Sequence, residues 1–112
     1  KRCVLSGCMY VIKQSSFYQE WFRDLRDLQA RRRIDIRLGQ VALGNLGDRK
    51  SVGDGVSELR LNYGPGYRIY YTVRRRTVVL LLVGGDKGSQ TSDINRAKRI
   101  ALEWTDADDD GR

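Results

Sequence analysis

Two arginines, Arg60 and Arg68, have the residue type and the surroundings needed for chemistry at a phosphate group. A guanidinium stays charged at physiological pH and can donate two hydrogen bonds to phosphate oxygens. Two such groups on one surface would stabilise the negative charge that develops when a phosphodiester is cleaved. The pair therefore predicts a binding site for a phosphate-containing substrate.

If the phosphate belongs to RNA, metal-free cleavage would also need a base for the 2′-hydroxyl proton and an acid for the leaving 5′-oxygen. The chain has no histidine, so other side chains would have to transfer these protons. Glu58 or Lys87 is a candidate base, and Lys87 or Tyr70 is a candidate acid. Each residue also has a structural alternative: Lys87 caps a strand end, Glu58 pairs with an arginine, and Tyr70 covers the sheet.

The arginines lie in a stretch whose polar and apolar residues alternate on both sides of Gly64-Pro65-Gly66. This period of two is typical of half-buried strands, and the turn suits a short hairpin loop. With those three residues as the whole loop, Tyr63 faces Tyr67, and Arg60 faces Tyr70. One face then packs on a core. The other face is a cationic surface, with a solvated face of paired charges as the alternative: Glu58, Arg60, Asn62, Arg68, Tyr70 and Thr72.

Flanking segments supply the elements that would hold this hairpin. Their predicted order is a strand (9–14), a helix (16–28), a second helix (30–43), a loop (44–55), the hairpin, a strand covered on both faces (77–83) and a last helix (90–104). Thr91 or Ser92 is the expected cap of the last helix. The predicted fold class is α+β, with an N-terminal strand and a helical hairpin packed on an antiparallel sheet, followed by a C-terminal helix.

The charge of the chain narrows the classes of partner. The 112 residues carry a formal net charge of +7, and residues 1–104 hold 20 basic and 10 acidic side chains. A body this basic favours polyanions, most simply nucleic acid. The alternatives are charge kept for solubility and an acidic protein partner. Basic residues outside the hairpin would extend a nucleic-acid-binding surface: Arg31, Arg32, Arg33, Arg37, Arg49 and Lys50.

Other features of the sequence limit the site and the domain. No run of about 18 apolar residues is present, so no membrane span is expected and the chain is predicted to be cytoplasmic. Cys3 and Cys8 cannot complete a zinc site without histidine, so no metal and no cofactor are expected. Residues 1–8 are predicted to be a flexible leader, residues 9–104 the folded domain, and residues 105–112 a disordered acidic tail.

Three segments carry a resemblance to a known family. They are Gly55-Val-Ser-Glu-Leu-Arg60, Gly64-Pro-Gly-Tyr-Arg-Ile-Tyr70, and Leu82-Val-Gly-Gly-Asp-Lys-Gly-Ser-Gln90 followed by Asp93-Ile-x-x-Ala97. Together they resemble the addiction-module killer proteins, the phage-related branch of the RelE/ParE/HigB toxin superfamily. The resemblance covers roughly residues 9–104 and implies a RelE-like fold.

This resemblance implies a function for the arginines. It implies the toxin of a type II toxin–antitoxin module, a ribosome-dependent messenger-RNA endonuclease inhibited by a cognate antitoxin, often of helix-turn-helix type. Arg60 and Arg68 fall where ribonucleases of the superfamily hold the scissile phosphate, and Lys87 falls where several relatives carry a basic residue near the reaction. The chain departs from the pattern by lacking histidine and a catalytic C-terminal tyrosine. Two alternatives are a ParE-like inhibitor of DNA gyrase and a prophage relic that only binds its antitoxin.

Overall fold

The computed structural model of the chain describes residues 9–104, so the predicted leader and acidic tail lie outside the described residues. The elements are β1 (Val11–Gln14), α1 (Ser16–Arg23), α2 (Leu28–Ala42), β2 (Arg49–Gly53), β3 (Val56–Leu61), β4 (Tyr67–Arg74), β5 (Val78–Asp86), the short 3-10 helix η1 (Lys87–Ser89) and α3 (Gln90–Glu103). The described strands form a sheet of order β1-β5-β4-β3-β2. β1 runs parallel to β5, and the other neighbours are antiparallel. The predicted α+β fold class is confirmed.

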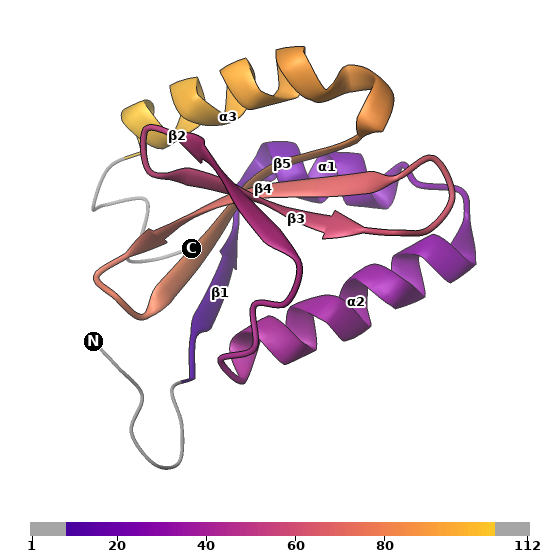
Figure 1. Cartoon of the computed structure of the whole chain (residues 1–112), viewed down its shortest axis with the longest axis horizontal. Coiled ribbons are helices and arrows are strands. Elements are labelled where there is room, and N and C mark those ends of the chain that lie inside the picture. Colours follow the sequence, from indigo (N-terminus) through magenta and orange to yellow (C-terminus); the bar gives the residue numbers. More distant parts are fainter. Residues whose placement is uncertain (1–8, 105–112) are drawn as a thin grey trace.

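Helices cover both faces of the sheet (Figure 1). On one face, α1 and α2 bury a core that includes Tyr18, Ile34 and Leu59. On the other face, α3 packs over a second core that includes Tyr70 and Ala97. The hairpin face that was expected to be an open cationic surface is therefore partly covered by α3.

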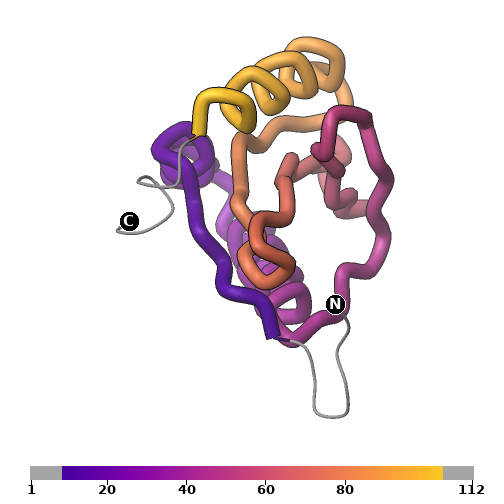
Figure 2. The backbone as a smooth tube through the Cα atoms, turned by 90° about the vertical axis from the view of Figure 1, so that its left-hand side faces the viewer, coloured from indigo at the N-terminus to yellow at the C-terminus, as the bar shows by residue number. Residues whose placement is uncertain are grey.

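β5 is an interior strand, which lies between β1 and β4 in the sheet. Figure 2 shows it running beside the indigo β1 strand. Residues 79–83 are all buried, as expected for an unbroken apolar run with a helix layer on each side. The strand continues to Asp86 instead of ending at Val83.

The register of the β3–β4 hairpin differs from the predicted one. Arg60 lies opposite Arg68, and Glu58 lies opposite Tyr70. The connection between the strands spans residues 62–66 rather than only the Gly-Pro-Gly segment. The shift is two residues, so each side chain keeps its predicted face of the sheet. The alternation in the sequence fixes the face, and it does not distinguish these two registers.

The two N-terminal helices meet earlier than predicted. α1 ends at Arg23, and Asp27 caps α2 by accepting hydrogen bonds from the backbone N–H groups of Gln29 (3.0 Å) and Ala30 (3.2 Å). Leu28, the last residue of the predicted first helix, instead begins α2 and is 72% exposed. The hydrogen bonds that Asp27 accepts start a new helix at this point, although the apolar pattern of the first helix continues to Leu28.

Two further predictions were wrong, one of a loop and one of a helix cap. The predicted loop 44–55 contains the edge strand β2, which pairs with β3 and has no apolar alternation to reveal it. The last helix begins at Gln90 after η1, with Ser89 at its N-cap position, and neither Thr91 nor Ser92 is the cap. Within residues 9–104, no helix is long and apolar enough to cross a membrane.

Candidate active site

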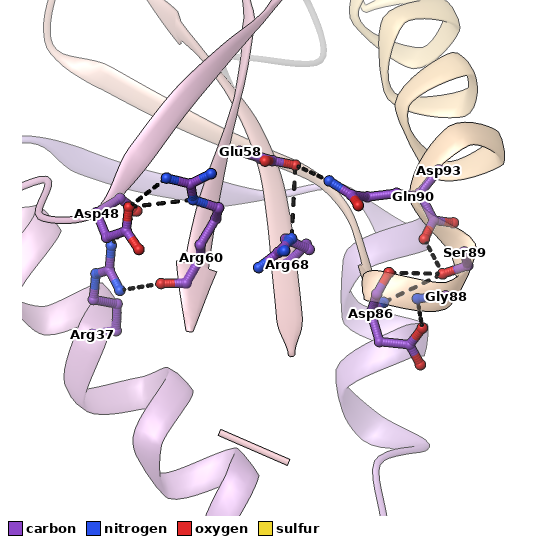
Figure 3. A network of polar contacts seen from close by, with 10 residues as sticks. All are labelled: Arg37, Asp48, Glu58, Arg60, Arg68, Asp86, Gly88, Ser89, Gln90 and Asp93. Atoms are coloured by element: carbon purple, nitrogen blue, oxygen red, sulfur yellow. Dashed lines mark hydrogen bonds and ion pairs between the residues drawn. The ribbon is translucent and has the colours of Figure 1, made fainter. Parts of the chain in front are cut away.

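The two strand arginines lie side by side, because Arg60 on β3 is opposite Arg68 on β4. Like charges placed opposite one another destabilise a sheet. Each guanidinium has its own carboxylate (Figure 3). Asp48 Oδ1 accepts hydrogen bonds from Arg60 Nε (3.2 Å) and from one terminal nitrogen (2.9 Å), while Glu58 Oε1 lies 4.0 Å from Arg68 Nε. These carboxylates allow the two cations to remain adjacent.

Arg68 lines an open hollow beside the β3–β4 connection. The hollow has a volume of about 450 Å³ and is lined by Asn62, Tyr63, Gly64, Pro65, Gly66, Arg68 and Lys87. The Arg68 side chain is only 11% exposed, and its Nε is buried without a hydrogen-bond partner among residues 9–104. Lys87 is exposed. The hollow thus combines a nearly buried guanidinium with an accessible ammonium group, a pair suited to a phosphate.

The position of Lys87 is fixed by the turn that follows β5. Asp86 caps η1, and its Oδ1 accepts a hydrogen bond from the Gly88 backbone N–H (2.8 Å). From the other side, Gly66 has a φ of +83°, and a Cβ there would lie 3.4 Å from Lys87 Cβ. The positive φ favours glycine at this position, and the 3.4 Å distance corresponds to an ordinary contact between the connection and the lysine. The turn after β5 and the β3–β4 connection therefore come together at Lys87.

Glu58 and Tyr70 lie beneath this surface. Their exposed fractions are 1% and 0%, because α3 covers their side of the sheet. Glu58 accepts a hydrogen bond from Gln90 Nε2 (3.2 Å), and the Tyr70 hydroxyl has no hydrogen-bond partner among the described residues. Burial raises the pKa of Tyr70 well above its ordinary value, and the carboxylates of Glu58 and Asp93 raise it further. Both residues are thus buried away from the hollow, and Glu58 is placed to support Arg68.

Asp93 reaches the sheet through a gap that a glycine provides. It lies in the first turn of α3, is 7% exposed and accepts a hydrogen bond from Ser89 Oγ. A Cβ on Gly85 would overlap the Asp93 carboxylate. Gly85 is opposite Arg68, so Asp93 lies beyond the Arg68 end of the arginine pair. Asp48 lies at the other end, beside Arg60. The opposite face of β5 has the same requirement, since a Cβ on Gly84 would overlap the Trp21 ring.

The predicted nucleic-acid-binding residues of α2 are not all brought to this surface. The Arg37 guanidinium donates to the carbonyls of Arg60 (2.8 Å), Leu46 (3.1 Å) and Asp48 (2.7 Å), which ties α2 to β3. Arg31 lies over the Phe22 ring, and Arg32 is exposed on the same helix. This helix covers the sheet face opposite to the strand arginines (Figure 1).

The two basic residues of β2 point to different faces. Lys50 is opposite Glu58 and so lies on the side of the arginines. Arg49 is opposite Leu59, whose side chain belongs to the core under α2. Both are exposed. Only Lys50 extends the surface around the arginine pair.

Sequence reasoning missed several residues of this region. Asp48 holds Arg60, Gln90 holds Glu58, and Asp93 lies against Gly85, yet each is a polar residue with no pattern that predicts its partner. One signal was present: two successive glycines inside a strand indicate a close approach by other groups. Residues 9–104 contain no group of three or more histidine, cysteine, aspartate or glutamate side chains placed to hold a metal ion.

Comparison with known proteins places the chain in a family. The chain belongs to the phage-derived Gp49-like family (DUF891), whose model matches residues 18–103. An uncharacterized protein of Haemophilus influenzae strain Rd is 42% identical to it over 92 residues, which make up 82% of this chain and 93% of the relative.

Solved structures of one bacterial toxin share the fold. A mutant of the E. coli toxin RelE with two arginines changed to alanine, in its free state, has a TM-score of 0.68 and 18% identity, covering 85% of this chain and 99% of RelE. The isolated RelE toxin in another crystal structure has a TM-score of 0.58 and 20% identity, covering 81% and 98%. The family match confirms the expected resemblance to a phage-related family, and the solved structures confirm the RelE-like fold.

Proposed function

We propose that this protein is the toxin of a type II toxin–antitoxin module and acts as a metal-independent endoribonuclease on messenger RNA at the ribosome. The observation that carries the proposal is the hollow in which Arg68 and Lys87 meet. The RelE-like fold supports the same class of activity by analogy. The proposed location is the cytoplasm, where the translated messages are.

The proposed reaction is attack of a 2′-hydroxyl on the adjacent phosphorus. A bond forms between the 2′-oxygen and phosphorus, and the bond to the 5′-oxygen breaks, which leaves a cyclic phosphate and a free 5′-hydroxyl. Arg68, held by Glu58, stabilises the added negative charge on the phosphate oxygens. Lys87 donates its proton to the 5′-oxygen. The 2′-hydroxyl proton passes to a base outside this chain, water or a ribosomal group, in keeping with dependence on the ribosome.

The partner proposed to control this activity is a cognate antitoxin of helix-turn-helix type. Residues 9–104 present a basic surface around Arg60, Arg68 and Lys50. An antitoxin that covers this surface would exclude RNA from the hollow. Arg60 is paired with Asp48 and 34% exposed, so its proposed role is to attract and position the backbone next to the cleaved phosphate.

The test is a transcriptome-wide map of RNA 5′ ends, made minutes after the protein is induced without its antitoxin. Wild type, Arg68→Ala and Lys87→Ala are compared at equal protein levels, with Arg99→Ala as a control, since Arg99 is an exposed cation on α3 outside the hollow. We expect new ends inside reading frames, lost when translation is blocked first. The Arg68 change should lower cleavage by roughly 100-fold or more.

The outcomes separate the alternatives. Cleavage that survives both hollow substitutions would remove the site from the proposal. Growth arrest with DNA breaks and no new RNA ends would favour a gyrase inhibitor of the ParE type. No growth defect would point to a relic that retains only antitoxin binding.

A further inference from the structure

Tyr63 is an aromatic residue without a place in either core. The alternation in the sequence predicts it on the apolar face with Leu59 and Leu61. In the structure it lies just after β3, is half-buried and is not among the described residues of the two core clusters. Tyr67, at the start of β4, does pack on the first core. The position of Tyr63 therefore needs another explanation than core packing.

The Tyr63 ring is held in place by two residues of the α2 region. Its hydroxyl donates a hydrogen bond to Asp27 Oδ2 (3.2 Å), and the Arg33 guanidinium lies 4.5 Å from the ring centroid. Desolvation and the bond to Asp27 raise the pKa of Tyr63, so the hydroxyl stays protonated. An aromatic ring fixed in this way loses little conformational entropy when something stacks on it.

Tyr63 lines two hollows. One is the hollow of Arg68 and Lys87. The other lies between α2 and the hairpin and is also lined by Arg33 and Arg37. A volume of about 450 Å³ for the first hollow is within the range of sites that hold small ligands. The lining of the first hollow thus combines two cations, which suit a phosphate, with an aromatic residue, which suits a base. A nucleotide contains both of these parts.

We propose that Tyr63 is the stacking platform for a nucleobase of single-stranded RNA next to the phosphate held by Arg68 and Lys87, with Arg33 supporting the ring. This assignment rests on the proposed function, since it presumes that RNA enters the hollow. Stacking on an aromatic side chain is tolerant of base identity, because every base has a π face. The platform would therefore strengthen binding without imposing a strict sequence.

The experiment measures binding of short, labelled single-stranded RNAs by fluorescence anisotropy at low salt, where phosphate contacts are strongest. One abasic nucleotide is moved along the RNA, and each RNA is tested with wild type, Tyr63→Leu, Tyr63→Phe and the control Arg99→Ala. For wild type and control, we expect an abasic nucleotide at one position to weaken binding by roughly 10- to 100-fold. Tyr63→Leu should bind intact and abasic RNA equally, and Tyr63→Phe should restore most of the difference because it keeps the ring.

Three results would overturn this assignment. The first is an abasic penalty that is the same in wild type and Tyr63→Leu. The second is that wild type does not bind RNA at low salt. Cleavage at the ribosome would then still be tested by the map of RNA 5′ ends. The third is that an acidic peptide competes with RNA, and that Tyr63→Leu lowers the affinity for the peptide as much as the affinity for RNA. The ring would then serve a protein partner. Failure of the proposed function has a different signature, because Lys87→Ala would then bind intact RNA as well as wild type.

Discussion

At the scale of single residues, Glu58 links stability to the proposed chemistry. A carboxylate that is 1% exposed needs partners, because removing it from water is costly. Its partners are Gln90, which donates a hydrogen bond, and Arg68, which supplies the opposite charge. Arg68 is therefore both a proposed substrate contact and the counter-ion of a buried acid. Substitutions at Arg68 must be interpreted with this in mind.

We predict that Arg68→Ala lowers the free energy of unfolding by about 1–3 kcal/mol, because it leaves Glu58 buried without its cation. The double substitution Arg68→Ala and Glu58→Gln should recover part of this loss while cleavage remains absent. Urea unfolding of the three proteins measures the first effect, and cleavage at equal folded concentration measures the second. Equal stability of the single and double variants would show that Glu58 does not depend on Arg68.

Tyr70 gives a complementary prediction. Its hydroxyl is buried and lacks a hydrogen-bond partner within residues 9–104, so Tyr70→Phe removes an uncompensated polar group. We expect stability to stay the same or to rise by up to about 1 kcal/mol, and cleavage to persist, since the hydroxyl does not reach the hollow. The measurements are urea unfolding and the map of RNA ends. A loss of cleavage with unchanged stability would make Tyr70 a candidate again for the acid that protonates the 5′-oxygen.

At the scale of elements, β5 is a strand that two helices approach closely. Trp21 of α1 packs on Gly84, and Asp93 of α3 packs on Gly85 from the other face. The pair of glycines sets the depth at which both helix layers rest on the sheet. It also sets how near Asp93 lies to Arg68, because Gly85 and Arg68 are opposite one another.

We predict that Gly85→Ala lowers the free energy of unfolding by about 1–3 kcal/mol, since its new Cβ would overlap the Asp93 carboxylate and force α3 away from the sheet. Adding Asp93→Ala should relieve part of this cost. The matched control is Gly39→Ala, at an exposed position of α2 with open space around the new methyl group, where a gain of about 0.5–1 kcal/mol is expected. Thermal or urea unfolding measures all three, and equal effects at both glycines would contradict the packing argument.

The elements also show what the sequence can predict. The apolar run 77–83 identified a strand that is covered on both faces, although β4 and not β5 is the middle strand of the sheet. Alternation placed the hairpin side chains on their correct faces, since burial on a sheet has a period of two. The same period leaves the register open by two residues, so the pairing of Arg60 with Arg68 was missed. β2 was missed because an exposed edge strand has no need of apolar residues. The covering of Glu58 and Tyr70 depends on where α3 packs, and no local pattern encodes that.

At the scale of the whole molecule, buried tyrosines contribute to the response of stability to alkaline pH. Burial raises the pKa of Tyr18 and Tyr70 above the ordinary value of about 10. In the unfolded chain these hydroxyls lose their protons above that pH, whereas in the folded chain they keep them. The contribution to stability is complete below pH 10 and is lost as the pH rises further.

We predict that the free energy of unfolding falls above pH 10 by about 1.4 kcal/mol per pH unit for each buried tyrosine. Tyr70→Phe should remove the part of this slope that one tyrosine contributes. Changes in lysine ionisation should affect the wild type and the variant alike. Urea unfolding at a series of pH values between 8 and 11.5 measures the difference. Identical slopes would mean that the Tyr70 hydroxyl ionises as readily in the folded protein as in the unfolded chain.

The pairing of the first strand with the last one orders events during synthesis. The Ser15 hydroxyl donates to the carbonyl of Leu82, 67 residues further along the chain, and β1 has β5 as its neighbour in the sheet. Lys87 follows β5 directly. The early part of a growing chain therefore has neither a complete sheet nor a complete hollow. A protein proposed to cut translated messages would remain inactive until β5 and Lys87 have been made, which protects the message from which it is being made.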